Sequence, residues 1–304
     1  MYHKSVLLHE ATQGLNVRPG GIYADLTYGG GGHTAAILQG VGNGTVIAFD
    51  QDEDALKNRI DDERLILIHA NFRHMRNFLK LYKAVPLDGI LADLGISSFQ
   101  IDERNRGFST RYDAALDLRM NRATRLTASH ILNQYPEQQI RIILKEYGEV
   151  PGANLLAAKI CDVRVNTPIE TTGQLMEIVK SVAPKNRENK IGAQVFQALR
   201  IEVNDELGAL KAMLDQTVEV LRPGGRLVVI SYHSLEDRMV KNFLRTGNTE
   251  GNLEKDFYGN PKLVFKQITR KPLMPVESEI MENSRARSAR LRIGERLPYE
   301  PNEE

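Results

Sequence analysis

The sequence has little of several residue types that mark particular protein classes. It contains one cysteine, Cys161, no tryptophan and only 6% aromatic residues. One cysteine excludes an internal disulfide and a cluster of thiolate metal ligands, and it fits a reducing compartment, for which we expect the cytoplasm. The longest apolar runs have the length of strands, so no membrane-spanning segment is expected. Charged residues follow Met1 too soon for a secretory signal.

The sequence also lacks a large surplus of charge of either sign, because 40 basic and 39 acidic residues leave a formal net charge of +1. Overall charge therefore does not indicate a nucleic-acid partner. The seven histidines show no spacing typical of metal ligands, and no metal is expected. A hydrophobic content of 41% with 26% charged residues is that of a globular protein, which excludes disordered, collagen-like and coiled-coil chains.

The first hundred residues alternate between strand and helix patterns. Short apolar runs predict buried strands at residues 21–26, 45–50, 65–68 and 87–93. Helical patterns follow the first three, at residues 33–38, 52–60 and 73–85. This alternation predicts an α/β fold with helices on both faces of a parallel sheet.

The alternation stops in the middle of the chain and resumes later. Helical patterns without a convincing buried strand fill the region from about residue 103 to residue 192. Strand-like runs then return at residues 226–231, 263–269 and 289–293. We therefore predict one discontinuous sheet domain and one inserted helical domain. Their expected limits are residues 1–103 with 193–304 for the sheet domain and residues 104–192 for the insert.

Two helical patterns belong to the returning part of the sheet domain. Apolar residues spaced by threes and fours from Val195 to Leu221 predict one long helix or two collinear helices. Another helix is expected at residues 234–244. Ser234 with Asp237 three residues later predicts a capping box at its start.

Four consecutive glycines, Gly29–Gly32, separate the first predicted strand from the helix after it. Glycines allow the backbone to approach a ligand closely, and the start of the helix offers N–H groups. Asp50 ends the second predicted strand, where a carboxylate can accept hydrogen bonds from both ribose hydroxyls of an adenosine group. The combination predicts a nucleotide cofactor, with a flexible turn as the alternative.

Two cofactors fit this arrangement. Gly30-x-Gly32-x-x-Ala35 matches the loose dinucleotide pattern and is compatible with NAD, hence with an oxidoreductase. Asp25 stands just ahead of the glycines, where methyltransferases that use S-adenosylmethionine (SAM) often carry an acid that serves the cofactor's ammonium group. No second mononucleotide-binding half follows the fourth strand, which disfavours NAD.

Five sequence strings then mark a resemblance to a known family. They are DLTYGGGGH at residues 25–33, LADLGISS at 91–98, LRPGGRL at 221–227, SYHSLEDR at 231–238 and NSRARSARLR at 283–292. The sequence resembles the RsmH family of bacterial 16S ribosomal RNA methyltransferases, also called MraW. The similarity covers essentially the whole chain from Val6 onward, and the second and fourth strings are more specific than the glycines.

The resemblance implies methyl transfer from SAM to the exocyclic N4 of a cytidine in the decoding region of 16S rRNA, in the small ribosomal subunit. It implies a class I SAM-dependent methyltransferase fold, which is Rossmann-like with a mostly parallel sheet, and a helical insert for RNA recognition. The cofactor-binding residues that it implies are Gly31, Gly32, His33, Asp50, Phe72, Asp93 and Gln100.

The resemblance leaves the groups around the reacting amine to be argued from chemistry. N4 of cytosine is a weak nucleophile, so a carboxylate that aligns it is useful. Asp93 is the candidate, although many amino-methyltransferases have Asn or Asp followed by Pro-Pro and an aromatic residue there, and this chain has DLGIS. The alternative is that Asp93 only binds the cofactor's methionine part or supports its loop.

His233 is the second candidate catalytic residue, because it ends the fifth predicted strand and can accept a proton or position the acceptor. The alternative is a histidine that hydrogen-bonds the backbone. A Ser-His-Asp hydrolase site built on Ser231, His233 and Asp237 is excluded, since no Gly-x-Ser-x-Gly elbow accompanies it.

Two segments are locally basic and are candidates for RNA contacts. Residues 104–125 carry six arginines against two aspartates, with Phe108 and Tyr112 available to stack on bases. Residues 262–292 include Arg285, Arg287 and Arg290. The alternative is a solvated surface or structural ion pairs. A non-catalytic ribosome assembly factor that keeps a SAM fold is the competing function, and the sequence does not indicate an oligomeric state.

Overall fold

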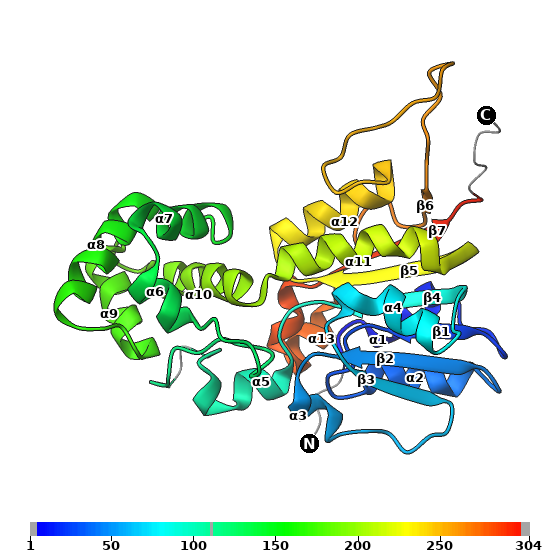
Figure 1. Ribbon diagram of the computed structural model, residues 1–304, viewed down its shortest axis with the longest axis horizontal. Helices are drawn as coiled ribbons and strands as arrows, with labels where there is room; N and C mark the ends of the chain where they lie inside the picture. The colour runs from blue at the N-terminus through cyan, green and yellow to red at the C-terminus, as the bar shows by residue number, and fades with distance from the viewer. Residues whose placement is uncertain (1–4, 110–111, 299–304) are drawn as a thin grey trace. The chain divides into compact units, whose positions relative to one another are not determined.

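A computed structural model of the chain describes residues 5–109 and 112–298 (Figure 1). These residues form two compact units. The sheet unit comprises the described residues of Met1–Gly95 and Leu207–Glu304, and the helical unit comprises those of Ile96–Glu206. Within the described ranges, no helix has both the length and the apolar character that crossing a membrane requires.

The sheet unit is built on seven strands in the order β3-β2-β1-β4-β5-β7-β6. The first five are parallel, whereas β7 runs antiparallel to both β5 and β6. The strands are β1 (Ile22–Asp25), β2 (Thr45–Asp50), β3 (Leu65–His69), β4 (Leu87–Asp93), β5 (Leu221–Ser231), β6 (Phe265–Gln267) and β7 (Arg290–Arg296). This mostly parallel, Rossmann-like sheet confirms the class I fold expected from the sequence.

Helices cover both faces of this sheet, and the two-residue repeat of the strands divides the core between them. On β4, Ile90 and Ala92 share a cluster with α4 (Met75–Leu81), α11 (Glu206–Val220) and α12 (Ser234–Thr246). Leu91 faces the other way and shares a cluster with α1 (Leu8–Leu15) and α2 (Gly32–Gly40). Shorter elements complete the unit: α3 (Glu53–Leu56), η1 (Phe72–His74), α13 (Glu277–Glu282) and η3 (Ser284–Ser288).

The helical unit has a core of its own. Ile131, Ile140, Leu156 and Leu175 are buried in one cluster that includes residues from α6 to α10. Its elements are α5 (Ser98–Asp102), η2 (Arg104–Arg106), α6 (Ala128–Gln134), α7 (Glu137–Glu146), α8 (Ala153–Asn166), α9 (Thr172–Val182) and α10 (Glu188–Asn204). A separate core of this size is what allows the segment to fold as a unit.

The long apolar stripe in the sequence is divided between the two cores. Val195 and Leu199 of α10 are buried in the helical unit, whereas Leu210 and Leu214 of α11 are buried in the sheet unit. Asp205 separates the two helices with a left-handed backbone, φ 47°.

The limits of the helical unit therefore differ from those expected. It begins at Ile96 rather than at residue 104, and it ends at Glu206 rather than at residue 192. The physical reason is that α10 packs its apolar side on the insert, whereas the sequence pattern alone continues without interruption into α11.

The capping box of α12 also differs from the expected one. His233 is the N-cap, and its Nδ1 accepts a hydrogen bond from the Glu236 backbone N–H at 3.4 Å, while the Glu236 carboxylate accepts one from the His233 N–H at 3.4 Å. The predicted box of Ser234 and Asp237 is wrong, because Asp237 instead pairs with Arg292 of β7 at 2.7 Å.

Candidate functional site

Three strands of the sheet unit end in aspartates at one edge. Asp25, Asp50 and Asp93 are the last residues of β1, β2 and β4, which are parallel neighbours. In open parallel sheets, ligands bind at the carboxyl ends of the strands, where the strand order reverses. Here the order reverses between β1 and β4, so this edge is the candidate site.

The glycine loop connects β1 to α2 at this edge. Gly29 (φ 51°) and Gly31 (φ 78°) have left-handed backbone conformations, which favour glycine. A Cβ at Gly31 would also lie 2.8 Å from the Tyr28 hydroxyl. Gly31 is the N-cap of α2, and the first N–H groups of a helix have no partner within it. The loop therefore brings backbone donors to the edge that carries the aspartates.

Asp50 is held by the backbone on both sides. Its Oδ2 accepts a hydrogen bond from the Gly29 N–H, and its Oδ1 accepts one from the Asp52 N–H, both at 2.8 Å. Burial nevertheless raises the pKa of Asp50 to about 6. Each carboxylate oxygen retains acceptor capacity beyond these bonds, so the arrangement is compatible with the predicted contact to ribose hydroxyls.

Asp25 supports the loop instead of facing a ligand. Its side chain is fully buried, Oδ2 accepts from the Thr34 hydroxyl at 2.6 Å, and Oδ1 accepts from the Thr27 N–H at 3.1 Å. The Thr27 hydroxyl in turn accepts from the Asp93 N–H at 2.7 Å. The expectation that Asp25 receives an ammonium group is therefore wrong, because this carboxylate joins the loop, α2 and β4 from within.

Asp93 is more accessible than Asp25, with 22% of its side chain exposed. Its Oδ1 accepts a hydrogen bond from the Tyr232 hydroxyl at 2.8 Å, and its Oδ2 lies 3.9 Å from Nδ1 of His33. Burial raises the pKa of Asp93 to about 6, while His33 and the Tyr232 hydroxyl act in the opposite direction. The hydrogen bond from Tyr232 thus orients the carboxylate at the edge of the sheet.

Sequence reasoning missed Tyr232. It lies just beyond the end of β5, in which Ile230 pairs with Asp93 across the sheet. Burial raises the pKa of Tyr232 well above its usual range, which keeps the hydroxyl a hydrogen-bond donor. The available signal was its position after the strand that neighbours β4, but the register that joins it to Asp93 is a property of the folded sheet.

The His33 side chain is also committed within the protein. It is buried, and its Nε2 lies 3.1 Å from the Val6 carbonyl oxygen, which requires the proton on Nε2. Its Nδ1 faces Asp93. The contact that His33 can offer a cofactor is therefore its backbone, as the predicted glycine-loop role requires.

The other predicted site residues lie in different surroundings. Phe72 begins η1, two residues beyond the end of β3, and is half-buried. Gln100 belongs to the helical unit, where its Oε1 accepts from the Ser97 N–H at 3.0 Å in the capping box of α5. His233 directs both ring nitrogens at Glu236, with Nε2 3.2 Å from Oε1.

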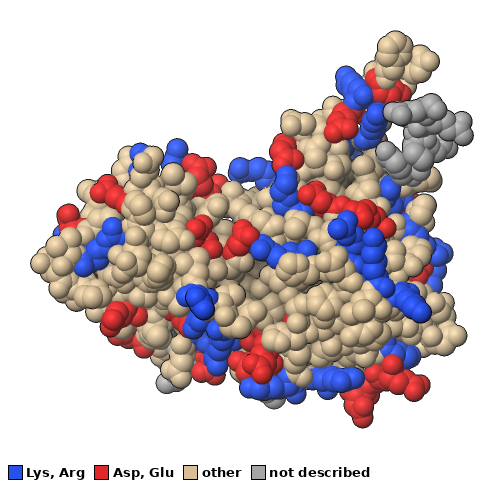
Figure 2. Space-filling model, in the orientation of Figure 1, with Lys and Arg blue, Asp and Glu red and all other residues tan. Residues whose placement is uncertain are grey.

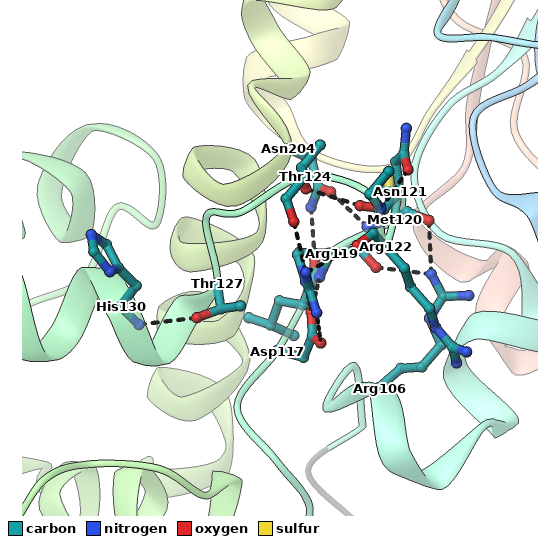
Figure 3. Close-up of polar contacts among 12 residues, drawn as sticks. Arg106, Asp117, Arg119, Met120, Asn121, Arg122, Thr124, Thr127, His130 and Asn204 are labelled. Atoms are coloured by element: carbon teal, nitrogen blue, oxygen red, sulfur yellow. Dashed lines mark hydrogen bonds and ion pairs between the residues drawn. The ribbon is translucent and has the colours of Figure 1, made fainter.

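Two of the arginines expected to contact RNA support the fold of the helical unit (Figure 3). Arg106 is buried and donates to the carbonyl oxygens of Arg119 and Met120, both at 2.8 Å. Arg119 binds Asp117 in a bidentate manner, with both distances 2.7 Å. Phe108, expected to stack on bases, is buried beside the Arg106 guanidinium. The expectation for Arg111 lies outside the described residues.

In the second basic segment, residues 262–292, Arg290 also contacts a protein group. Its guanidinium lies 3.2 Å from Oδ2 of Asp237, the same carboxylate that binds Arg292. A count of charges along the sequence thus overstates the number of arginines that are available to bind phosphate, because a guanidinium group that is paired with a carboxylate is already neutralised.

The site holds a set of groups suited to a nucleoside and an amine. Backbone donors of the glycine loop and the Asp50 carboxylate can bind a sugar, and the oriented Asp93 carboxylate can accept hydrogen bonds from an amino group. Burial has raised the pKa of both carboxylates without a lysine or arginine among the causes. A cationic ligand would therefore be stabilised here.

Comparison with known proteins agrees with this chemistry. The family model described as "MraW methylase family" matches residues 1–297. A protein of Flavobacterium johnsoniae named ribosomal RNA small subunit methyltransferase H is 51% identical over 97% of this chain and 98% of its own. Relatives of the same name from Cytophaga hutchinsonii and Amoebophilus asiaticus are 52% and 51% identical, over 97% of this chain and 100% and 96% of theirs. The chain therefore belongs to the MraW methylase family, and its cofactor is S-adenosylmethionine rather than NAD.

Proposed function

We propose that the protein methylates the exocyclic N4 of a cytidine in the decoding region of 16S rRNA in the small ribosomal subunit. The relatives' shared name supports the ribosomal substrate. The observation that carries the amine specificity is the Asp93 carboxylate, which the Tyr232 hydroxyl orients at the carboxyl edge of the sheet. The expected compartment is the cytoplasm, where this substrate is found.

The cofactor would be held by residues of the sheet unit. We assign Asp50 to its ribose, the backbone of Gly31, Gly32 and His33 to its polar groups, and Phe72 to its adenine. When bound, SAM supplies a methyl group on a positively charged sulfur, and the desolvated carboxylates fit that charge. Gln100, in the helical unit, remains a prediction of the family resemblance, as does the role of that unit in RNA recognition.

The acceptor amine would be aligned mainly by Asp93. A carboxylate that accepts hydrogen bonds from the amino hydrogens favours the positive charge that develops on the nitrogen during methyl transfer. The amine proton can leave after transfer, so no strong base is needed. We place His233 as a positioning residue, because both of its ring nitrogens face Glu236.

Isotope-labelled SAM tests the proposal directly. Small subunits that lack the modification, naked rRNA and total protein are incubated in parallel, and the RNA is digested to nucleosides for mass spectrometry. We expect N4-methylcytidine from the small subunits. Absence of label in every pool, despite measurable SAM binding, would overturn the enzymatic proposal and favour a ribosome assembly factor.

Replacing Asp50 by asparagine is expected to weaken SAM binding by about 10- to 100-fold, because hydrogen bonds to a charged acceptor contribute about 1.5–3 kcal/mol. Titration calorimetry measures this change. The variant should retain most of its maximal rate at saturating SAM. Exposed Asp61, replaced in the same way, is the control and should leave the dissociation constant unchanged.

Removing the Tyr232 hydroxyl is expected to move the pH profile. Asp93 must be ionised to accept hydrogen bonds from the amine, so kcat/KM should rise with pH through about 6. The Tyr232 hydroxyl lowers the pKa of Asp93, and Tyr232→Phe should therefore shift this rise to higher pH. Initial rates between pH 5 and 8 check the shift, and an unmoved profile would assign the rise to another group.

A further inference from the structure

An arm projects from the sheet unit between α12 and β6 (Figure 1). At its tip, Phe257 and Tyr258 are 97% and 85% exposed, more than any other aromatic side chain in the described ranges. Their rings meet edge to face, with centroids 5.5 Å apart. In Figure 2 the end of the arm is uncharged, and charged side chains lie below it. Two aromatic rings held in water in this way indicate a binding partner.

The two exposed aromatic residues lie in a turn that is held by hydrogen bonds. Asp256 Oδ1 accepts hydrogen bonds from the backbone N–H groups of Tyr258 at 2.9 Å and Asn260 at 2.8 Å. The Asp256 N–H donates to the Asn260 carbonyl at 2.9 Å, and the Gly259 N–H donates back to the Asp256 carbonyl at 3.0 Å. Below the turn, Lys255 and Pro261 form a bridge between the two sides of the arm. The backbone thus presents the two rings at a fixed place.

The base of the arm is also fastened to the sheet unit. Asn242 of α12 donates to the Thr249 carbonyl at 3.1 Å, and Lys211 of α11 contacts both Thr249 and Glu250. Asn248 Oδ1 accepts from the Gly251 N–H at 2.9 Å. An arm that is anchored at its base and hydrogen-bonded at its tip can transmit a binding contact to the folded unit.

Two lysines beside the aromatic tip favour RNA as the occupant. The arm, residues 247–264, contains Lys255 and Lys262 against Glu250, Glu254 and Asp256. Glu250 contacts Lys211 of α11, and Asp256 holds the turn. Aromatic rings beside lysines are the combination with which proteins bind unpaired nucleotides, because every base has a face that stacks and a phosphate that attracts cations.

The arm leaves the sheet at the edge opposite the candidate site. Phe265 of β6 pairs with Arg296, and the neighbouring Glu295 pairs with Arg226 near the start of the parallel pairing of β5. The 13 residues of α12 separate this edge from the carboxyl end of β5, about 20 Å at the rise of an α-helix. A contact at the tip therefore reaches a part of the substrate away from the reacting base.

We propose that this arm is a second RNA-docking element, which stacks Phe257 and Tyr258 on unpaired bases of the ribosomal substrate. The proposal rests on the proposed ribosomal function for the identity of the RNA. The arm supplies affinity and takes no part in methyl transfer. It therefore acts on the binding of a large substrate and leaves the cofactor site unchanged.

The test compares binding of the full-length wild type and tip variants to purified small subunits, independently of methylation. The double variant Phe257→Ala, Tyr258→Ala should weaken binding and raise KM for the particle by about tenfold or more, since stacking on one base contributes several-fold to about a hundredfold in affinity. The SAM dissociation constant and kcat should stay unchanged. Tyr82→Ala, which removes a half-exposed tyrosine after α4, is the matched control.

A second pair of substitutions separates RNA from a protein partner. Phe257→Leu with Tyr258→Leu keeps an apolar tip without an aromatic face, and it should bind as weakly as the alanine variant. Restored binding by leucine, or unchanged binding of the alanine variant, would overturn the proposal. If the wild type binds small subunits but methylates no RNA, and the tip variants lose this binding, the docking role of the arm stands and the proposed reaction is refuted. The two proposals can therefore fail separately.

Discussion

Replacing Asp93 by alanine is expected to reduce kcat for methyl transfer by about 100-fold or more, below detection in most assays. Removal of one group that stabilises charge at the reacting atom lowers rates by about this factor. This carboxylate is oriented at the candidate edge by Tyr232 at 2.8 Å and is partly exposed. Single-turnover methyl transfer, measured together with the SAM dissociation constant, checks the expectation.

The two roles considered for Asp93 differ in what else the variant loses. If Asp93 aligns the amine, Asp93→Asn keeps SAM affinity within a few-fold and loses kcat. If Asp93 binds the methionine part of the cofactor, SAM affinity falls together with kcat/KM. A tight-binding, slow variant supports the acceptor role, whereas a variant with both normal kcat and normal SAM affinity contradicts both roles. Exposed Asp61→Asn again serves as the control.

Much of the sheet could be predicted from local sequence. The expected strands at residues 45–50 and 87–93 are β2 and β4 with the same limits, because fully buried parallel strands appear as continuous apolar runs. Asp50 and Asp93 end those runs, so their place at the carboxyl edge followed from the strand direction. Helices on the surface were less predictable: the pattern at residues 52–60 gives only the short α3, Glu53–Leu56.

What the sequence could not supply are contacts set by distant partners. The strings Ser234-x-x-Asp237 and His233-x-x-Glu236 both suit a helix start, and serine is the commoner N-cap. Arg292, which is remote in the sequence, binds the Asp237 carboxylate, and Glu236 instead completes the capping box with His233. Tyr232 escaped notice for the same reason, because the register between β4 and β5 brings it to Asp93.

Replacing Asp237 by alanine is expected to lower the free energy of unfolding of the sheet unit by about 3–5 kcal/mol, the usual effect of breaking a buried ion pair by removing one partner. Asp237 and Arg292 are both buried, with Nε 2.7 Å from Oδ1 and Nη2 3.1 Å from Oδ2. The variant leaves the Arg292 guanidinium without its carboxylate between α12 and β7. Thermal and denaturant unfolding measure the loss.

An exposed ion pair in the same unit provides the control. Arg76 and Glu219 contact each other at 2.8 Å with 40% and 51% of their side chains exposed, and Glu219→Ala should cost less than about 1 kcal/mol. Both variants delete one carboxylate, so they differ mainly in burial. Equal losses would show that burial of the Asp237 pair adds nothing to its stabilising effect.

The effect of Asp237 should also depend on pH in a defined direction. Burial alone would raise the pKa of Asp237, but hydrogen bonds and charges from Arg292 and Arg290 outweigh it and hold the pKa below its ordinary value. A carboxyl group with a lowered pKa stabilises the fold above its unfolded pKa of about 4 and loses that contribution as the pH falls. The wild type and Asp237→Ala should therefore differ most in stability near neutral pH and converge in acid. A difference that does not shrink as the pH falls would mean that packing, not charge, accounts for it.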